Sequence, residues 1–97
     1  MEDIEEKRQS LRIDMESDKI VIDWLDDQHE KVAEATCVDL SRRGVLFVYS
    51  EHFALGSLLH ITFNPHNDSR YTVKGQVCRS TNIGHIYQIA VQLIDLN

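Results

Sequence analysis

The sequence contains six short apolar runs with period-two alternation, separated by clusters of turn-forming residues. The clearest run is Leu58–Phe63, where Leu59, Ile61 and Phe63 alternate with smaller or more polar neighbours. Alternate side chains of a strand point to opposite faces, so each run predicts a half-buried strand. The other five runs span residues 19–25, 32–38, 44–50, 71–79 and 87–95. Six strands joined by short turns predict an all-β fold, a small six-stranded antiparallel barrel whose closure removes exposed sheet edges.

A chain of 97 residues can form one domain with a modest core. Residues 1–12 contribute only Ile4 and Leu11 as sizeable apolar side chains before the first strand. We therefore predict a short N-terminal arm over residues 1–12, followed by the barrel domain over residues 13–97. Helix is expected only in the arm and in one possible turn within residues 51–55.

Several classes of protein are disfavoured by the composition. No apolar run is long enough to span a bilayer, and no basic segment precedes an apolar one at the start, so a cytoplasmic protein is expected. Cys37 and Cys78 lie within predicted strands without CxxC spacing, which favours reduced thiols in the core. The five histidines lack ligand spacing, so no metal site is expected. Trp24 is expected to pack in the core or at its rim.

The charge distribution favours a small anionic ligand. A formal net charge of −6 argues against a protein that coats nucleic acid, because such binding needs a broad basic face. No nucleophile stands beside a base in the pattern an enzyme would need. Half of the basic residues nevertheless fall in two short segments, and they are Lys7, Arg8, Arg12, Arg42 and Arg43. Such local positive potential in an acidic chain suits a small anion.

The first basic segment has the pattern RxxxR. Arg8 and Arg12 are four residues apart, so both guanidinium groups would project in the same direction from a helix or compact turn. By itself this spacing is more typical of a solvated helical face than of a binding site.

The second basic segment, residues 38–44, is a polar turn between two predicted strands. Asp39 and Ser41 have side chains that bond to nearby backbone N–H groups, which organises a turn and leaves other amides free to face an anion. Gly44 can adopt positive φ and lets a ligand approach the backbone. An ordinary hairpin turn remains the alternative when this segment is considered alone.

Taken together, RxxxR at Arg8 and Arg12 and DxSxxG at Asp39, Ser41 and Gly44 resemble the two signatures of the PilZ domain, the bacterial receptor domain for cyclic di-GMP. The 26 residues between the motifs hold a predicted strand, a turn and a second strand, which is the layout of the family. The resemblance covers nearly the whole chain and implies a PilZ-like barrel.

The resemblance also implies a function without catalysis. It assigns ligand binding to Arg8, Arg12, Asp39, Ser41 and Gly44, with the arginines contacting phosphate and guanine edges and Asp39 accepting hydrogen bonds from guanine. Arg43 and Lys7 would be secondary phosphate neighbours. One ligand or an intercalated pair would fit, and no cofactor is implied.

A receptor of this kind would act on a downstream protein partner, through an arm that becomes ordered when the ligand binds. The alternative is a PilZ-fold adaptor that binds proteins but no nucleotide. Many PilZ domains carry a C-terminal helix after the last strand, and this sequence predicts none before Asn97.

Overall fold

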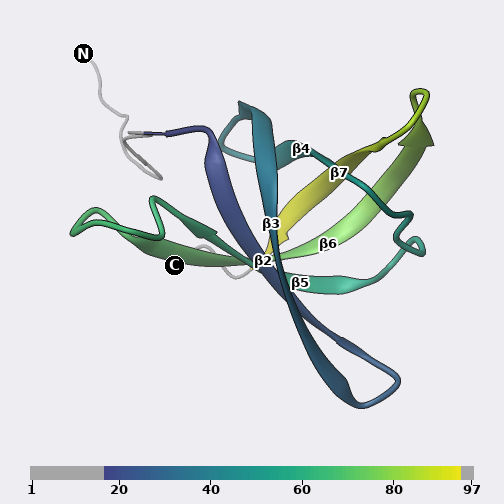
Figure 1. Cartoon of the computed structure of the whole chain (residues 1–97), viewed down its shortest axis with the longest axis horizontal. Helices are drawn as coiled ribbons and strands as arrows, with labels where there is room; N and C mark the ends of the chain where they lie inside the picture. Colours follow the sequence, from purple (N-terminus) through teal and green to yellow (C-terminus); the bar gives the residue numbers. More distant parts are fainter. Residues whose placement is uncertain (1–16, 95–97) are drawn as a thin grey trace.

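The computed structural model describes residues 17–94, which form a closed antiparallel barrel (Figure 1). The six strands are β2 (Lys19–Asp26), β3 (His29–Leu40), β4 (Gly44–Tyr49), β5 (Leu58–Phe63), β6 (Tyr71–Asn82) and β7 (Tyr87–Ile94). Their order around the barrel is β2-β3-β4-β7-β6-β5, and β5 pairs with β2 to close it. The predicted all-β barrel with six strands is confirmed. The proposed boundary between arm and barrel at residue 12 lies outside the described residues.

The β2–β3 hairpin is longer than the sequence predicted. Its turn consists of Asp27 and Gln28, both with positive φ (54° and 71°), and Asp26 pairs directly with His29. Two successive residues with positive φ form the type I′ turn, whose twist matches that of the flanking strands. The polar residues before Val32, which suggested a longer turn, therefore belong to the strand.

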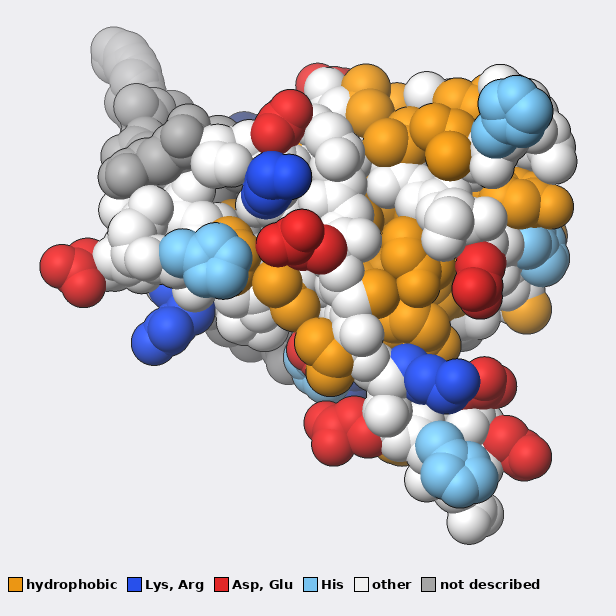
Figure 2. Space-filling model, viewed as in Figure 1, with side chains coloured by type: hydrophobic (Ala, Val, Ile, Leu, Met, Phe, Trp, Pro, Cys, Tyr) orange, Lys and Arg blue, Asp and Glu red, His pale blue; other side chains and the backbone are white. Residues whose placement is uncertain are grey.

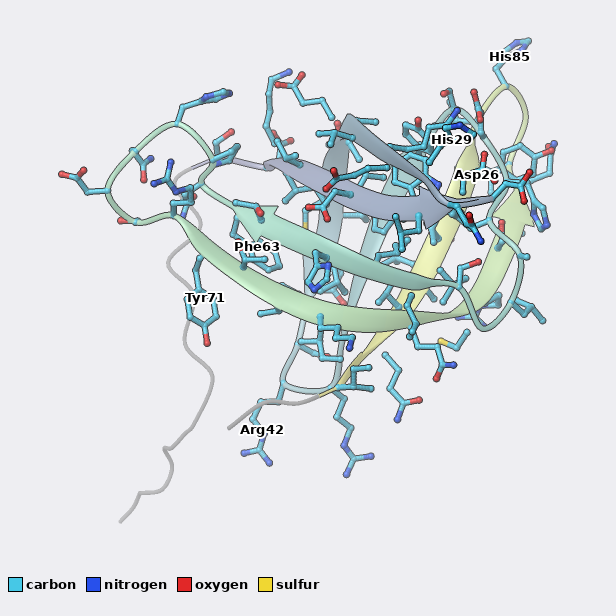
Figure 3. The ribbon with its side chains drawn as sticks, turned by 90° about the horizontal axis from the view of Figure 1, so that it is seen from below. Asp26, His29, Arg42, Phe63, Tyr71 and His85 are labelled. Atoms are coloured by element: carbon cyan, nitrogen blue, oxygen red, sulfur yellow. The ribbon has the colours of Figure 1, made fainter. Side chains whose placement is uncertain are left out.

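The core is made by the inward-facing residues of all six strands. Ile20, Ile22, Phe47, Ile61 and Ile89 are fully buried, together with further Val, Leu and Phe side chains. The burial of Leu59, Ile61 and Phe63 confirms the alternation predicted for β5. Tyr71, the first residue of β6, is 47% exposed (Figure 3), because it lies at the end of its strand, where the barrel no longer covers it.

Two β-bulges change the phase of alternation. The register shifts between Cys37 and Asp39 on β3 and between Val77 and Arg79 on β6, so Val38 and Cys78 are the extra residues. A bulge leaves its extra residue unpaired and re-aims the side chains that follow. Cys37 is buried as predicted, but the prediction that Cys78 lies in the core is wrong, because it faces outward next to Val77.

The connection from β4 to β5 contains no helical turn, contrary to the turn considered for residues 51–55. Instead, the Ser57 N–H and hydroxyl both donate to the Ala54 carbonyl oxygen, and Gly56 adopts φ 89°. The Gly56 N–H donates to the Val77 carbonyl, and the Val77 N–H donates to the Ser57 carbonyl. This segment is therefore held against β6 before β5 begins.

Residues 64–70, whose sequence begins NPHNDS, form the turn between β5 and β6. Asn64 has φ 49° and is almost completely buried, and its side-chain amide donates to the Ser69 carbonyl oxygen. Asparagine tolerates the left-handed region better than other residues with a side chain.

Throughout residues 17–94 no helix is long and apolar enough to cross a membrane, and no three His, Cys, Asp or Glu side chains gather as a metal site requires.

Candidate ligand-binding loop

The DxSxxG motif lies at the tip of the β3–β4 hairpin, as predicted. Asp39 is near the end of β3, Ser41 begins the turn, and Gly44 is the first residue of β4. The structure therefore brings these three residues together in one exposed loop. Arg42, at the tip, points away from the barrel (Figure 3).

Ser41 organises the turn through its backbone and its hydroxyl group. The Ser41 N–H donates to the Gly44 carbonyl oxygen at 2.9 Å. The N–H groups of Arg43 and Gly44 both donate to the Ser41 hydroxyl oxygen at 3.3 Å. This arrangement confirms that the serine organises the turn. Because the Arg43 and Gly44 N–H groups already donate to Ser41, they are not free to bind an anion.

Asp39 owes its exposure to the bulge in β3. Strict alternation after Ala35 and Cys37 would point Asp39 into the core, but the extra residue Val38 changes the phase and leaves the carboxylate exposed. Within residues 17–94 that carboxylate has no hydrogen-bond or ion-pair partner. A bulge beside a site that needs a re-aimed side chain is a recurrent feature of sheets. The Asp39 carboxylate can therefore accept bonds from a ligand.

Cys37 is the buried residue directly before the bulge. Its thiol lies 3.5 Å from the Asp39 carbonyl oxygen, to which it donates. Burial raises the pKa of the Cys37 thiol above its usual value, and the negative charges of Asp39 and Asp18 act in the same direction. Cys37 therefore packs in the core below the loop, and its raised pKa favours the neutral thiol.

The backbone of Gly44 does not have the positive φ that was predicted. A Cβ atom on this residue would lie 2.5 Å from the Val91 carbonyl oxygen of β7. The prediction of a left-handed φ is therefore wrong: glycine is needed here because two backbones approach closely. The Leu93 N–H donates to the Arg43 carbonyl at 2.9 Å, so β7 fixes this side of the loop.

Two exposed arginines, Arg42 and Arg43, add positive charge to the loop. Their guanidinium groups have no ion-pair partner among residues 17–94. The loop thus presents one acceptor, the Asp39 carboxylate, and two cationic donors on a short turn with a fixed backbone. Such a combination suits a ligand that carries both anionic groups and hydrogen-bond donors.

The N-terminal segment joins the barrel beside this loop. The Cys37 N–H donates to the Asp18 carbonyl oxygen at 2.7 Å, two residues before Asp39 along β3. Arg8 and Arg12, and the secondary neighbour Lys7, lie outside the described residues. Their attachment point is nevertheless defined, because the chain enters β2 at the barrel end that carries the motif.

One feature near the opposite end was not predicted. Trp24, Tyr49 and Phe53 come from separate parts of the sequence and pack together around a pocket of about 270 Å³. The sequence placed Trp24 at the core or rim, which is confirmed by its half-buried position. Its aromatic neighbours could not be found from spacing, because barrel closure brings them together.

Comparison with known proteins gives one match. The family model described as PilZ domain matches residues 6–97, almost the whole chain, and this range includes both motifs. No curated protein and no solved structure was found to match the chain. A closed six-stranded antiparallel barrel agrees with the family's fold. The chain therefore belongs to the PilZ domain family.

Proposed function

We propose that this PilZ domain is a cytoplasmic receptor for cyclic di-GMP and has no catalytic role. The observation that carries the proposal is the Asp39 carboxylate, which is exposed by a bulge and left without a partner within residues 17–94. It stands on a loop whose backbone is fixed by Ser41 and by the contact of Gly44 with β7.

Guanine is the base that such a carboxylate recognises best. Its N1–H and exocyclic amine are adjacent donors, and a carboxylate can accept both at once, whereas adenine lacks this pair. Charge-assisted bonds of this kind contribute about 1.5 to 3 kcal/mol each. Asp39 would therefore select guanine, while Ser41 keeps the turn in shape.

The two phosphates and the remaining edges of the bases would be bound by arginine. Arg8 and Arg12 provide planar guanidinium groups that bind phosphate or guanine O6 and N7 bidentately and can stack on a base. Arg12 is six residues before Asp18, so it is tethered within roughly 20 Å of the Asp18 carbonyl, next to the loop. Arg43 and Lys7 would contribute further positive charge.

In this proposal the ligand acts by ordering the N-terminal arm. Residues 4–12 offer little apolar surface, and each ordered residue costs about 1 to 2 kcal/mol of backbone entropy. Phosphate contacts with Arg8 and Arg12 would offset that cost and hold the arm against the barrel. The acidic residues that precede them would move as well, which changes the surface presented to a downstream protein.

Equilibrium binding separates a receptor from an adaptor that has lost the nucleotide. The full chain is titrated with cyclic di-GMP by isothermal calorimetry, which also gives the number of ligands per chain. Saturable heat that disappears in Arg8→Ala and Arg12→Ala supports the receptor. No heat of binding under conditions in which the chain is folded would instead support the adaptor.

A further inference from the structure

The pocket near Trp24 lies far from the DxSxxG loop. β3 runs the length of the barrel, and Lys31, which lines the pocket, is eight residues before Asp39. At about 3.3 Å per residue these two positions are roughly 26 Å apart. In Figure 3, Asp26 and His29 at the β2–β3 turn lie on the other side of the barrel from Arg42. A molecule in this pocket would leave the loop accessible.

Aromatic side chains form a rigid wall of the pocket. The Trp24 ring lies edge-on to Phe53, with centroids 4.9 Å apart, and edge-on to Tyr49 at 6.1 Å. Tyr49 and Phe53 are stacked at 5.7 Å, and Phe53 is only 5% exposed. Each ring is thus held by the other two. The wall is preformed, so binding against it would cost little ordering of side chains.

Large aliphatic side chains are exposed around this wall. Leu25 is 72% exposed and Leu58 is 51% exposed, and both line the pocket. Leu55, 68% exposed, follows Ala54, another lining residue. Figure 2 shows hydrophobic side chains gathered on this half of the molecule, between the projecting β2–β3 hairpin and the β6–β7 turn. A rigid aromatic pocket surrounded by exposed leucines is typical of a protein interaction site.

The rim of this surface is acidic. Asp26 and Glu51 line the pocket, and Asp27 and Glu30 are exposed on the same β2–β3 hairpin as Asp26. Lys31 is the one Lys or Arg among the lining residues, which also include His52, and the Lys31 ammonium group lies 3.9 Å from the Asp26 carboxylate. The surface therefore combines apolar area with excess negative charge.

We infer that this end of the barrel is a docking site for a segment of a partner protein that presents a bulky apolar side chain next to Lys or Arg. The apolar side chain would enter the pocket against Trp24, and the basic residue would meet Asp26 and Glu51 at the rim. A second copy of this chain is disfavoured, because a symmetric contact would bring the acidic rims together. An anionic lipid surface is disfavoured by the same charges. The inference goes beyond nucleotide binding and does not depend on it.

The test begins with a selection for peptides that bind the full chain from a phage-displayed random library. Enriched peptides are synthesised, and their affinity is measured from the fluorescence of Trp24, the only tryptophan in the chain. Because Trp24 lines the pocket, its emission responds when the pocket is occupied. The inference predicts peptides with a large apolar residue near Lys or Arg.

Two variants of the proposed surface have matched controls elsewhere. Leu58→Ser removes an apolar side chain beside the pocket, and Val32→Ser removes one that is 65% exposed on β3 but does not line it. Glu51→Lys reverses a charge on the rim, and Asp68→Lys reverses one in the 64–70 turn. Circular dichroism checks that each variant is folded.

The expected result is a loss of peptide affinity of at least about tenfold in Leu58→Ser and in Glu51→Lys, with less than about twofold change in either control. Three results would overturn the inference. The library could yield no peptide that binds saturably. The enriched peptides could lack basic residues. The peptides could also bind Leu58→Ser and Glu51→Lys with the same affinity as the parent chain.

Discussion

Gly44 faces the backbone of Val91 so closely that a Cβ atom on Gly44 would lie 2.5 Å from the Val91 carbonyl oxygen. The last residue of the DxSxxG motif is therefore a structural part of the contact between β4 and β7. The next strand residue, Val45, pairs with Val91 and is buried. A motif whose sequence suggests only ligand binding therefore also contributes, through Gly44, to the packing of β4 against β7.

Gly44→Ala should destabilise the domain. The added methyl group meets backbone that cannot rotate away, so the hairpin must shift, and overpacking of this kind costs about 1 to 3 kcal/mol. Thermal unfolding followed by circular dichroism measures the effect. Arg42→Ala, which removes an exposed side chain from the same loop, should change the free energy of unfolding by less than about 0.5 kcal/mol. An Ala variant as stable as the parent would show that this contact is not tight.

Asp39→Asn should weaken cyclic di-GMP binding without unfolding the domain. The carboxylate is exposed and has no partner within residues 17–94, so its loss removes only the acceptor proposed for guanine. Loss of one charge-assisted bond predicts an affinity lower by about tenfold or more. Asp68→Asn in the 64–70 turn is the matched control. If Asp39→Asn lost the circular dichroism signal of the β-strands, Asp39 would be needed for folding and could not be assigned to ligand binding alone.

The Cys37 thiol predicts a specific dependence of stability on pH. Its pKa is raised in the folded state, chiefly by burial, so the folded chain keeps the proton while the unfolded chain loses it near the ordinary value of 9.0. The free energy of unfolding should therefore be independent of this thiol below that pH and fall as the pH rises above it. The pKa of Tyr49 is also raised, by burial and by the negative charge of Glu51, which adds a decline of the same sign only above its ordinary value of 10.0.

Chemical denaturation between pH 7 and 10 isolates the cysteine contribution. The decline between pH 9 and 10 should become shallower in Cys37→Ala, because the tyrosine contribution begins only above pH 10.0. It should be unchanged in Cys78→Ser, because Cys78 is exposed. Identical slopes in all three proteins would contradict the assigned protonation of Cys37.

The strands could be predicted because apolar side chains recur at every second position within them and because turn-forming residues separate them. The bulge at Val38 could not, since alternation alone assigns Asp39 to the core, and only pairing with β4 shows the change of phase. The constraint on Gly44 could not be predicted either, because it comes from β7, far along the chain. The pocket around Trp24 likewise depends on barrel closure.

Hydrogen exchange tests whether the ligand orders the arm. Amides of residues 4–12 should exchange rapidly without cyclic di-GMP and become protected when it is bound, because the proposed contacts of Arg8 and Arg12 hold the segment. Amides of β5 should be protected equally in both states and serve as the internal reference. Equal protection of residues 4–12 with and without ligand would rule out ordering of the arm as the signal.

The most direct test of the central claim is a calorimetric comparison of cyclic di-GMP with cyclic di-AMP on the same preparation of the full chain. Both ligands carry two phosphates, so any difference reports contacts to the bases. Asp39 can pair with the N1–H and amine of guanine but not with adenine, which predicts at least about tenfold tighter binding of cyclic di-GMP. The affinity should also fall as salt rises, since phosphate contacts are electrostatic. Equal affinities for the two dinucleotides would contradict the proposed recognition of guanine by Asp39.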